Sequence, residues 1–299
     1  MFTQTQIDEY ESFQAGQGFC LDHGFDVIEI SGKDRASFLH NFCTADIKSM
    51  EAGDLVEAFV LNPKGKTIGF VLVLCQPTRL CMVLRQNQTH AIRHHLEKFV
   101  IVEDVQLATV EATEMVVQSW EESQQDQHYF SVDITAGSCL FFPPAIGNYA
   151  GGPLTDGKQV CSREVWNSIR IENGFPYGGE DVLEDNLAQE LNRDKTAISF
   201  KKGCYLGQET VARLDALGHT NRSFAKIRVA GDSIVAPQTP ILCSEKGQDK
   251  EVGRVTSSGW SPRFQCTLVL AVLKKPFHTE GTDVRLGAET GQVMSSLRA

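Results

Sequence analysis

One cysteine, Cys204, lies in a segment whose composition favours thiol chemistry. Two lysines, Lys201 and Lys202, precede it, and a helical pattern begins near Glu209. Ammonium groups and the positive end of a helix both favour the thiolate, which is the form that reacts and binds metals. The alternative is that Cys204 is a small buried hydrophobe, as free cysteines often are. The residues alone leave both interpretations open.

The other eight cysteines form no recognisable metal or disulfide pattern. The total of nine is odd, the spacings are scattered and no C-x-x-C pair occurs, so we expect reduced thiols in a cytoplasm-like compartment. His90 and His94 have the i, i+4 spacing of a helical metal site. No glutamate or third ligand accompanies them, so we interpret them as a helix face and expect no metal site.

Composition excludes several broad classes of protein. The chain has 299 residues, of which 41% are hydrophobic and 22% charged, and a formal net charge of −10. Non-specific nucleic-acid binding requires many lysines and arginines, so we expect no direct nucleic-acid partner. No apolar stretch approaches the ~18 residues of a membrane span, and the N-terminus lacks the features of a signal or transit peptide. We therefore expect a cytoplasmic protein.

The cysteine segment resembles a family signature. Residues 202–209 match the pattern K-G-C-Y-x-G-Q-E throughout. This pattern is similar to that of the YgfZ family, the folate-binding relatives of the glycine-cleavage T-protein (GcvT). The matching residues are Lys202, Gly203, Cys204, Tyr205, Gly207, Gln208 and Glu209. Weaker similarities cover most of the chain, at 30–40, 44–47, 62–66, 166–174, 253–257 and 270–273.

The resemblance implies both a fold and a function. The fold would be α+β and GcvT-like, with two intertwined α+β lobes and a C-terminal β-barrel around a central cavity that binds tetrahydrofolate. The function would be that of an accessory protein that supports the assembly or repair of iron–sulfur clusters in enzymes, including tRNA-modifying ones. Cys204 would be the functional thiol, with Lys202 beside it. The implied partners are folate and iron–sulfur client enzymes, and we expect a monomer.

A folate site needs an aromatic slot for the pterin and a carboxylate for its hydrogen-bond donors. The resemblance places Phe25 and Trp166 where YgfZ proteins have two tryptophans, and Glu172 where GcvT has its pterin-binding glutamate. Phe25 keeps the ring but loses the indole N–H. Asn62 lies in a turn, 62–65, that could contact the ligand. The alternatives are core packing for Trp166, a solvated helix position for Glu172 and an ordinary hairpin turn for Asn62.

The rival function is a folate-dependent aminomethyltransferase like GcvT. In GcvT the second strand of the hairpin carries an aspartate pair, one member of which is needed for transfer. The aligned positions here are Gly69 and Phe70, which cannot bind a proton or stabilise a cationic amine. We therefore expect no transferase activity. A third idea, an RNA-binding module, lacks the alternation of aromatic and basic residues.

Local patterns predict the elements that would position these residues. Apolar alternation and turn residues predict strands, with a hairpin over 55–74, and helical spacing predicts helices. The expected strands are 26–30, 55–61, 66–74, 80–84 and 105–110, and the expected helices are 35–43, 87–99, 163–173 and 209–214. Asn87 and Ser162 are expected caps. We expect a polar loop at 121–128 and an acidic surface loop with a short helix at 180–193.

The composition and residue pattern of the sequence change after Asn221. Five short β-rich segments separated by Gly, Pro and Ser predict a small barrel or sandwich, at 226–229, 241–243, 252–256, 267–272 and 283–286. We therefore expect a GcvT-like folate-binding α+β region at 1–220 and a C-terminal β-barrel domain at 221–299.

Overall fold

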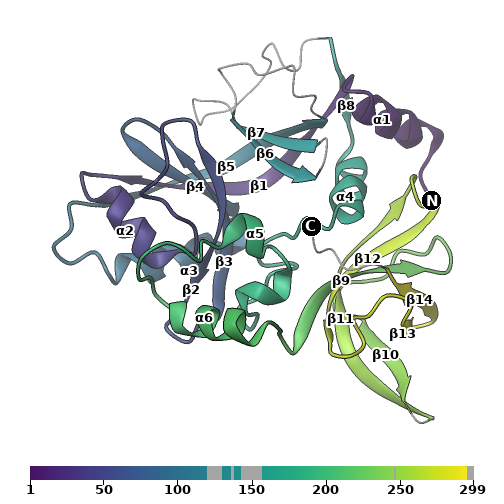
Figure 1. The fold of residues 1–299 in the computed structure, drawn as a ribbon. Coiled ribbons are helices and arrows are strands. Elements are labelled where there is room, and N and C mark those ends of the chain that lie inside the picture. Colours follow the sequence, from purple (N-terminus) through teal and green to yellow (C-terminus); the bar gives the residue numbers. More distant parts are fainter. Residues whose placement is uncertain (120–129, 136–137, 143–156, 246, 295–299) are drawn as a thin grey trace.

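The structure is a computed structural model that describes residues 1–119, 130–135, 138–142, 157–245 and 247–294 (Figure 1). The polar loop predicted at 121–128 lies outside these residues. A sheet flanked by helices occupies one side of the molecule, and a β-barrel occupies the other. This mixed α+β architecture with a closed C-terminal barrel confirms the fold class expected from the sequence.

The sheet has eight strands and is mostly antiparallel. Its strand order is β2-β3-β4-β1-β5-β7-β6, and β8 pairs in parallel with the start of β1. The strands predicted in the first hundred residues are confirmed, but β1 and β5 are longer than predicted because they pair with each other along their whole length. The bounds are β1 Gly18–Ser31, β2 Leu55–Leu61, β3 Thr67–Cys75, β4 Arg79–Arg85, β5 Gln106–Ser119, β6 Phe130–Thr135, β7 Ser138–Phe142 and β8 Gln159–Cys161.

Strand β1 changes its register in the middle. Its pairing with β5 shifts between Asp22 and Phe25 and again between Phe25 and Val27. Such bulges add a residue to one strand and redirect the side chains near it. Beyond the bulge the usual alternation places Val27 in one hydrophobic core and Ile28 in the other. The irregularity therefore lies where β1 faces the larger core.

The two cores lie on opposite sides of the sheet. Residues of helices α1 (Gln4–Gln14) and α4 (Arg163–Glu172) belong to the larger core, and residues of α2 (Arg35–Phe42) and α3 (Gln86–Glu97) belong to the smaller one. Ser162 is the N-cap residue of α4, as predicted, whereas Asn87 lies inside α3 and is not its cap. The remaining helices are η1 (Ala188–Leu191), α5 (Asp194–Ala197) and α6 (Gln208–Leu217).

The segment 180–193 contains the predicted short helix, η1, and Glu184 and Asp185 are exposed as expected, but several of its polar residues are buried and do not form a surface loop. Asp181 is fully buried, and Asn186 and Glu190 are only 2% and 3% exposed. Arg170 of α4 donates to Asp181 at 2.9 Å, and Ser257 of the barrel donates to the same carboxylate at 2.7 Å. Long-range partners neutralise these acids, and the segment joins the sheet region to the barrel.

The barrel closes in the order β10-β11-β12-β9-β14-β13 around its own core. Five of its strands were predicted, and the sixth, β14, was missed. Their bounds are β9 Arg222–Val229, β10 Pro240–Glu245, β11 Gln248–Ser261, β12 Cys266–Lys274, β13 Asp283–Leu286 and β14 Glu289–Val293. Among the described helices, none is long and apolar enough to cross a bilayer.

Candidate functional site

Cys204 lies on an exposed loop between α5 and α6. Gly207 is the N-cap residue of α6 with φ at +82°, and Cys204 precedes the first helical residue by four positions. The Cys204 side chain is exposed, so it is not the buried hydrophobe of the alternative interpretation. Among the cysteines whose side chains the structure describes, five are buried and two are half-buried: Cys20, Cys43, Cys81, Cys161 and Cys266, and then Cys75 and Cys243.

Lys202 anchors this loop to the end of α2. Its buried ammonium group donates to the carbonyl oxygens of His40, Cys43 and Ala45 at 2.5, 2.8 and 2.7 Å. Carbonyl groups at a helix C-terminus carry partial negative charge and attract a cation. Burial lowers the pKa of Lys202. The structure therefore gives Lys202 three partners of its own, and an effect of its charge on Cys204 stays a prediction.

The hairpin turn supports the same loop from the other side. The Asn62 side chain accepts from the backbone N–H groups of Lys64 and Lys66 at 2.9 and 3.1 Å, which stiffens the turn. A Cβ atom on Gly207 would come within 2.7 Å of the Asn62 carbonyl oxygen, so the close approach needs glycine. The Thr210 hydroxyl donates to the Lys64 carbonyl at 3.0 Å. The two most distinctive motifs of the sequence thus pack together.

An aromatic cavity lies inside the sheet region, away from these surface contacts. Four rings line it: those of Phe25, Phe70, Phe175 and Tyr177. Phe25 meets Tyr177 edge to face at 6.1 Å between ring centroids, and Phe70 meets Phe175 at 5.9 Å. Phe25, one of the two rings that the resemblance assigned to a folate slot, therefore lines an aromatic cavity, and folate binding there stays a prediction. Phe70, at a position that the resemblance assigns to an aspartate of GcvT, lines the same cavity.

Trp166 stands behind Tyr177. Its indole N–H donates to Asp22 Oδ2 at 2.9 Å and lies 2.5 Å from the Tyr177 hydroxyl oxygen. The Tyr177 hydroxyl also donates to Asp22. Burial, and then the charge of Asp22, raise the pKa of Tyr177 well above its ordinary value, so the phenol stays protonated. Trp166 is 1% exposed, and it supports the cavity wall without lining the cavity.

Glu172 holds three parts of the fold together. Its carboxylate accepts from the hydroxyls of Tyr10 and Ser261 at 2.8 and 2.5 Å, and its carbonyl accepts from Lys226 at 2.6 Å. It is 4% exposed, which excludes a solvated helix position. Burial raises its pKa. Both carboxylate oxygens have protein partners, and Glu172 is not among the residues lining the aromatic cavity.

Sequence reasoning missed Arg85 and Tyr177, which line this cavity, and Asp22, which contacts both of them from behind the lining. Asp22 is an acid in a largely apolar strand and is only 1% exposed. The three apolar residues directly before it, 19–21, were a usable signal, because a buried carboxylate needs partners. Arg85 and Tyr177 carried no local signal.

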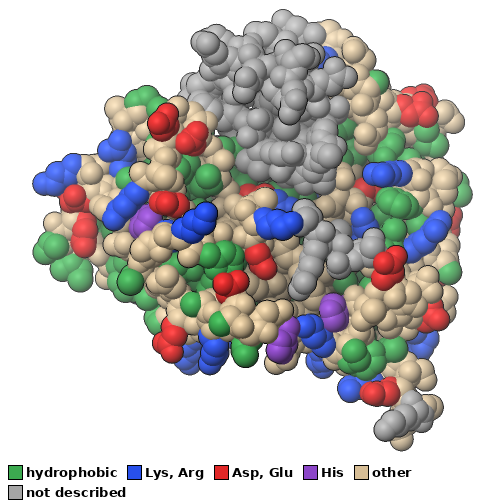
Figure 2. Space-filling view, in the orientation of Figure 1, with side chains coloured by type: hydrophobic (Ala, Val, Ile, Leu, Met, Phe, Trp, Pro, Cys, Tyr) green, Lys and Arg blue, Asp and Glu red, His purple; other side chains and the backbone are tan. Residues whose placement is uncertain are grey.

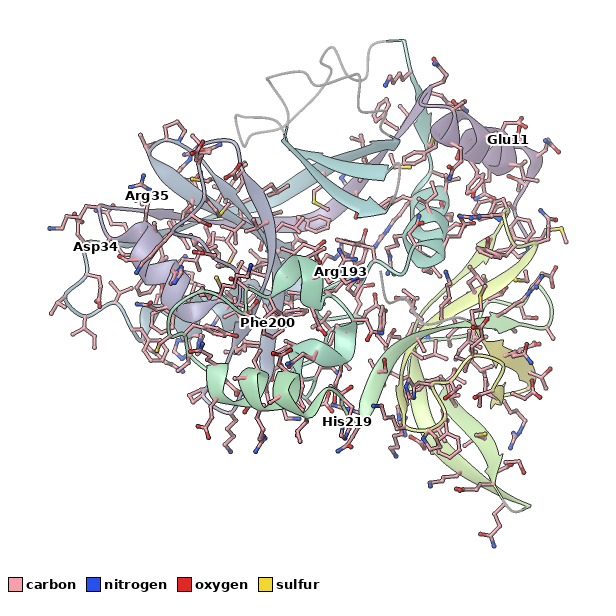
Figure 3. All side chains as sticks on the ribbon, viewed as in Figure 1. Glu11, Asp34, Arg35, Arg193, Phe200 and His219 are labelled. Atoms are coloured by element: carbon pink, nitrogen blue, oxygen red, sulfur yellow. The ribbon has the colours of Figure 1, made fainter. Side chains whose placement is uncertain are left out.

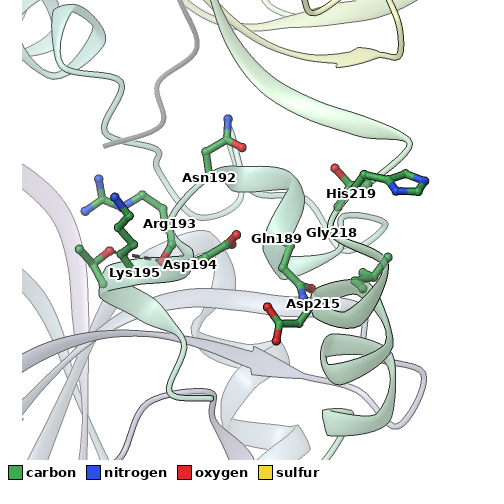
Figure 4. A pocket seen from close by; sticks show the side chains of 11 residues that line it. Gln189, Asn192, Arg193, Asp194, Lys195, Asp215, Gly218 and His219 are labelled. Atoms are coloured by element: carbon green, nitrogen blue, oxygen red, sulfur yellow. Dashed lines mark hydrogen bonds between the residues drawn. The ribbon is translucent and has the colours of Figure 1, made fainter. Parts of the chain in front are cut away.

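A second hollow, of about 370 Å³, lies beside the C-terminal end of α6 (Figure 4). Arg193, Lys195 and His219 line it together with Asp194 and Asp215. The carboxylate of Glu57 accepts from Arg193 Nε at 2.8 Å, so that guanidinium is already paired. The lining of this hollow therefore carries both signs of charge.

The surface around these features also carries mixed charge. Figure 2 shows lysine and arginine interspersed with aspartate and glutamate across one face. Phe200, four residues before Cys204, is 47% exposed and lies on this side of the molecule (Figure 3). Within the described ranges, no group of three His, Cys, Asp or Glu side chains is placed to hold a metal ion.

Comparisons with known proteins identify similar chains. The model of the glycine cleavage T-protein C-terminal barrel domain matches residues 222–295. The aminomethyltransferase T of the Bartonella henselae glycine cleavage system has a similar structure, with a TM-score of 0.72 and 14% identity over 97% of this chain and 89% of that one. At this identity the similarity shows the fold alone.

Three curated relatives are each 25% identical. One is a chloroplastic Arabidopsis thaliana protein named as a transferase, for which the match covers 93% of this chain and 69% of that protein. The second is the tRNA-modifying protein YgfZ of Colwellia psychrerythraea, for which the match covers 67% of this chain and 68% of that protein. The third is the mitochondrial iron–sulfur cluster assembly factor IBA57 homolog of Mycosarcoma maydis, for which the match covers 64% of this chain and 52% of that protein. These matches confirm the resemblance to YgfZ- and GcvT-like proteins.

Proposed function

We propose that this protein is a tetrahydrofolate-binding accessory factor that supports assembly or repair of iron–sulfur clusters in other enzymes, tRNA-modifying enzymes among them. The observation that carries the proposal is the placement of Cys204. The signature loop holds this thiol in solvent, while Lys202 and the hairpin turn fix the backbone on either side. A thiol that serves a partner or a cluster must be reachable.

Similarity to named proteins supports the same proposal. Relatives of comparable identity are named as a tRNA-modifying protein and as an iron–sulfur cluster assembly factor. The expected partners are therefore iron–sulfur client enzymes. Monomeric action and a cytoplasmic location stay predictions, since relatives named as chloroplastic and mitochondrial are also similar.

Folate binding is the second part of the proposal. The cavity provides an aromatic slot at Phe25 and Tyr177, with Trp166 behind it, in a fold shared with an aminomethyltransferase of the glycine cleavage system. The test is a titration of the intact protein with 5-formyltetrahydrofolate, followed by tryptophan fluorescence. We expect saturable quenching in the wild type, whereas an unchanged signal would contradict folate binding at this place.

The thiol is tested in cells that lack the protein. We expect wild-type protein to restore the activity of iron–sulfur enzymes and Cys204→Ala to restore none of it. Cys243→Ala, which removes a half-buried thiol of the barrel, is the matched control and should restore it fully. Full restoration by Cys204→Ala would refute the proposed role of the thiol.

Aminomethyl transfer is the second candidate function, because one relative is named as a transferase and the fold is shared. The cavity favours the first candidate. Phe70 lines it where the GcvT resemblance places an aspartate, and a phenyl ring cannot stabilise a cationic amine. We expect no tetrahydrofolate-dependent release of ammonia from an aminomethyl-lipoyl carrier protein. Measurable release would overturn this choice.

A further inference from the structure

The guanidinium group of Arg85 fills the aromatic slot. Arg85 ends β4, and its guanidinium carbon lies 4.8 Å from the centroid of the Phe25 ring and 4.6 Å from that of Tyr177. The guanidinium is planar and delocalised, and it packs favourably against aromatic rings. A flat group with nitrogen atoms around a central carbon therefore already occupies the position expected for a flat ligand.

The polar groups around this guanidinium are acceptors. Its Nη1 donates to the His23 carbonyl at 2.9 Å and lies 3.6 Å from Asp22 Oδ1, while Nη2 donates to Glu180 at 3.0 Å. The pyrimidinone edge of a pterin carries a 2-amino group and an N3–H on a planar N–C–N unit. That edge presents the same pattern of donors as one side of a guanidinium.

Asp22 has an oxygen with spare capacity. Its Oδ2 accepts from Trp166 and Tyr177, whereas Oδ1 is buried and accepts no hydrogen bond. Its ion-pair partner in the unliganded protein is Arg85 Nη1 at 3.6 Å, so a group that replaces the guanidinium would have to supply this buried oxygen with a new donor. The bulge in β1 sets this arrangement, and a Cβ on Gly24 would come within 3.4 Å of Arg85 Nη1.

The small volume of the cavity also indicates that a flat ligand would have to replace the Arg85 guanidinium. The cavity beside Arg85 holds about 20 Å³, which is room for roughly one water molecule. A ring can enter only if the Arg85 side chain leaves. Glu180, whose side chain is 36% exposed, gives the guanidinium a partner nearer the surface, whereas Asp22 is only 1% exposed.

We propose that Arg85 occupies the position of the ligand's amino-pyrimidinone edge in the unliganded protein, and that Asp22 is the carboxylate that recognises this edge. This inference rests on the proposed folate binding and makes it specific. Arg85 moves outward with Glu180 when the pterin enters, and Asp22 and the His23 carbonyl then accept from the 2-amino and N3–H groups. Glu172, whose two oxygens already have partners, is a positioning residue.

The test measures affinity for 5-formyltetrahydrofolate by calorimetry in five variants of the full chain, one of which is Glu172→Gln. Arg85→Ala should bind at least about tenfold tighter than wild type, because the ligand no longer competes with the side chain. Asp22→Asn should bind about tenfold or more weakly, because the site loses its charged acceptor. The matched controls are Arg79→Ala on the same strand as Arg85 and Asp26→Asn on the same strand as Asp22. Both should bind as wild type does.

A pair of small probes tests recognition without any substitution. Pterin has the 2-amino group, and lumazine has an oxygen in its place. The wild type should bind pterin about tenfold or more tightly than lumazine. The 2-oxo group of lumazine cannot donate a hydrogen bond to the Asp22 carboxylate or the His23 carbonyl. Equal binding of the two probes would overturn the inference even if Arg85→Ala failed to fold.

Other outcomes separate this inference from the proposed function. If the wild type binds 5-formyltetrahydrofolate and Arg85→Ala binds it equally or more weakly, Arg85 is a ligand contact and the inference fails alone. A greater loss of folate affinity in Glu172→Gln than in Asp22→Asn would also overturn the inference, because Glu172 would then be the carboxylate that recognises the pterin. If neither wild type nor Arg85→Ala binds the folate or either probe, the proposed folate function fails with it.

Discussion

The region around Asp22 and the loop that carries Cys204 are built in opposite ways. Asp22 is 1% exposed, and its carboxylate takes hydrogen bonds from Trp166 and from Tyr177, whose ring lines the aromatic cavity. Cys204 is exposed, and its loop is fixed by contacts of its neighbours with main-chain atoms elsewhere in the fold. The proposed function requires this difference, because a small molecule would be enclosed in the interior region and another macromolecule would be met at the exposed loop.

The largest effect is expected where the interior region joins the barrel. Asp181→Ala leaves the buried Arg170 guanidinium without its carboxylate and removes the acceptor for Thr256 and Ser257. Breaking a buried ion pair in this way should lower the free energy of unfolding by about 3–5 kcal/mol. Urea denaturation measures it. Asp185→Ala, which breaks an exposed pair with Arg222, should cost at most about 1 kcal/mol. Equal effects would contradict the account of this junction.

The next effect tests how the exposed loop is held. Lys202→Met removes an ammonium group that donates to three carbonyl oxygens, and we expect a loss of about 1–3 kcal/mol in the free energy of unfolding. Cleavage of the loop by chymotrypsin at Phe200, which is exposed, should become faster. Lys201→Met removes an exposed neighbour and is the control. If Lys202→Met is as stable and as resistant to chymotrypsin as the Lys201→Met control, Lys202 does not anchor the loop.

A smaller effect should appear in the pH dependence of the free energy of unfolding. Burial raises the pKa of Glu172, so the folded protein holds this proton more tightly than the unfolded chain does. Its contribution to stability is therefore present at low pH and is lost as pH rises from the ordinary value of about 4.5 through the raised pKa. Glu172→Gln should lack this loss. Urea denaturation of both proteins between pH 4 and 8 measures it, and parallel curves would show that Glu172 does not titrate there.

The smallest perturbation probes exposure without changing the fold. Brief alkylation at neutral pH, read by peptide mass spectrometry, should label Cys204 before the other cysteines whose side chains the structure describes. The reason is access, since five of those thiols are buried and two half-buried. Labelling of Cys20 or Cys43 at the same rate in folded protein would break the contrast between the two regions.

Much of the fold could be predicted because its signals are local. The hairpin over 55–74, the cap at Ser162 and the short barrel segments follow from alternation, turn residues and capping chemistry within a few positions. The last strand, β14, was missed because Val293 is its only large apolar residue, so its sequence shows no alternation.

The candidate site was harder, because its residues acquire their roles from distant partners. Lys202 was expected to act on the nearby thiol, but its ammonium group binds carbonyls about 160 positions away in sequence. Asp181 lies in an acidic run, and its partners are in α4 and β11. The bulge that aims Asp22 depends on the register between β1 and β5, which no local pattern encodes.

The folate affinity of the Cys204→Ala protein tests the separation of the two sites most directly. Calorimetry with 5-formyltetrahydrofolate should give the wild-type dissociation constant within about twofold, because the cavity and the loop share no lining residue. The same variant should fail to restore iron–sulfur enzyme activity in cells. Loss of folate binding together with activity would contradict the account, since Cys204 would then belong to the folate site.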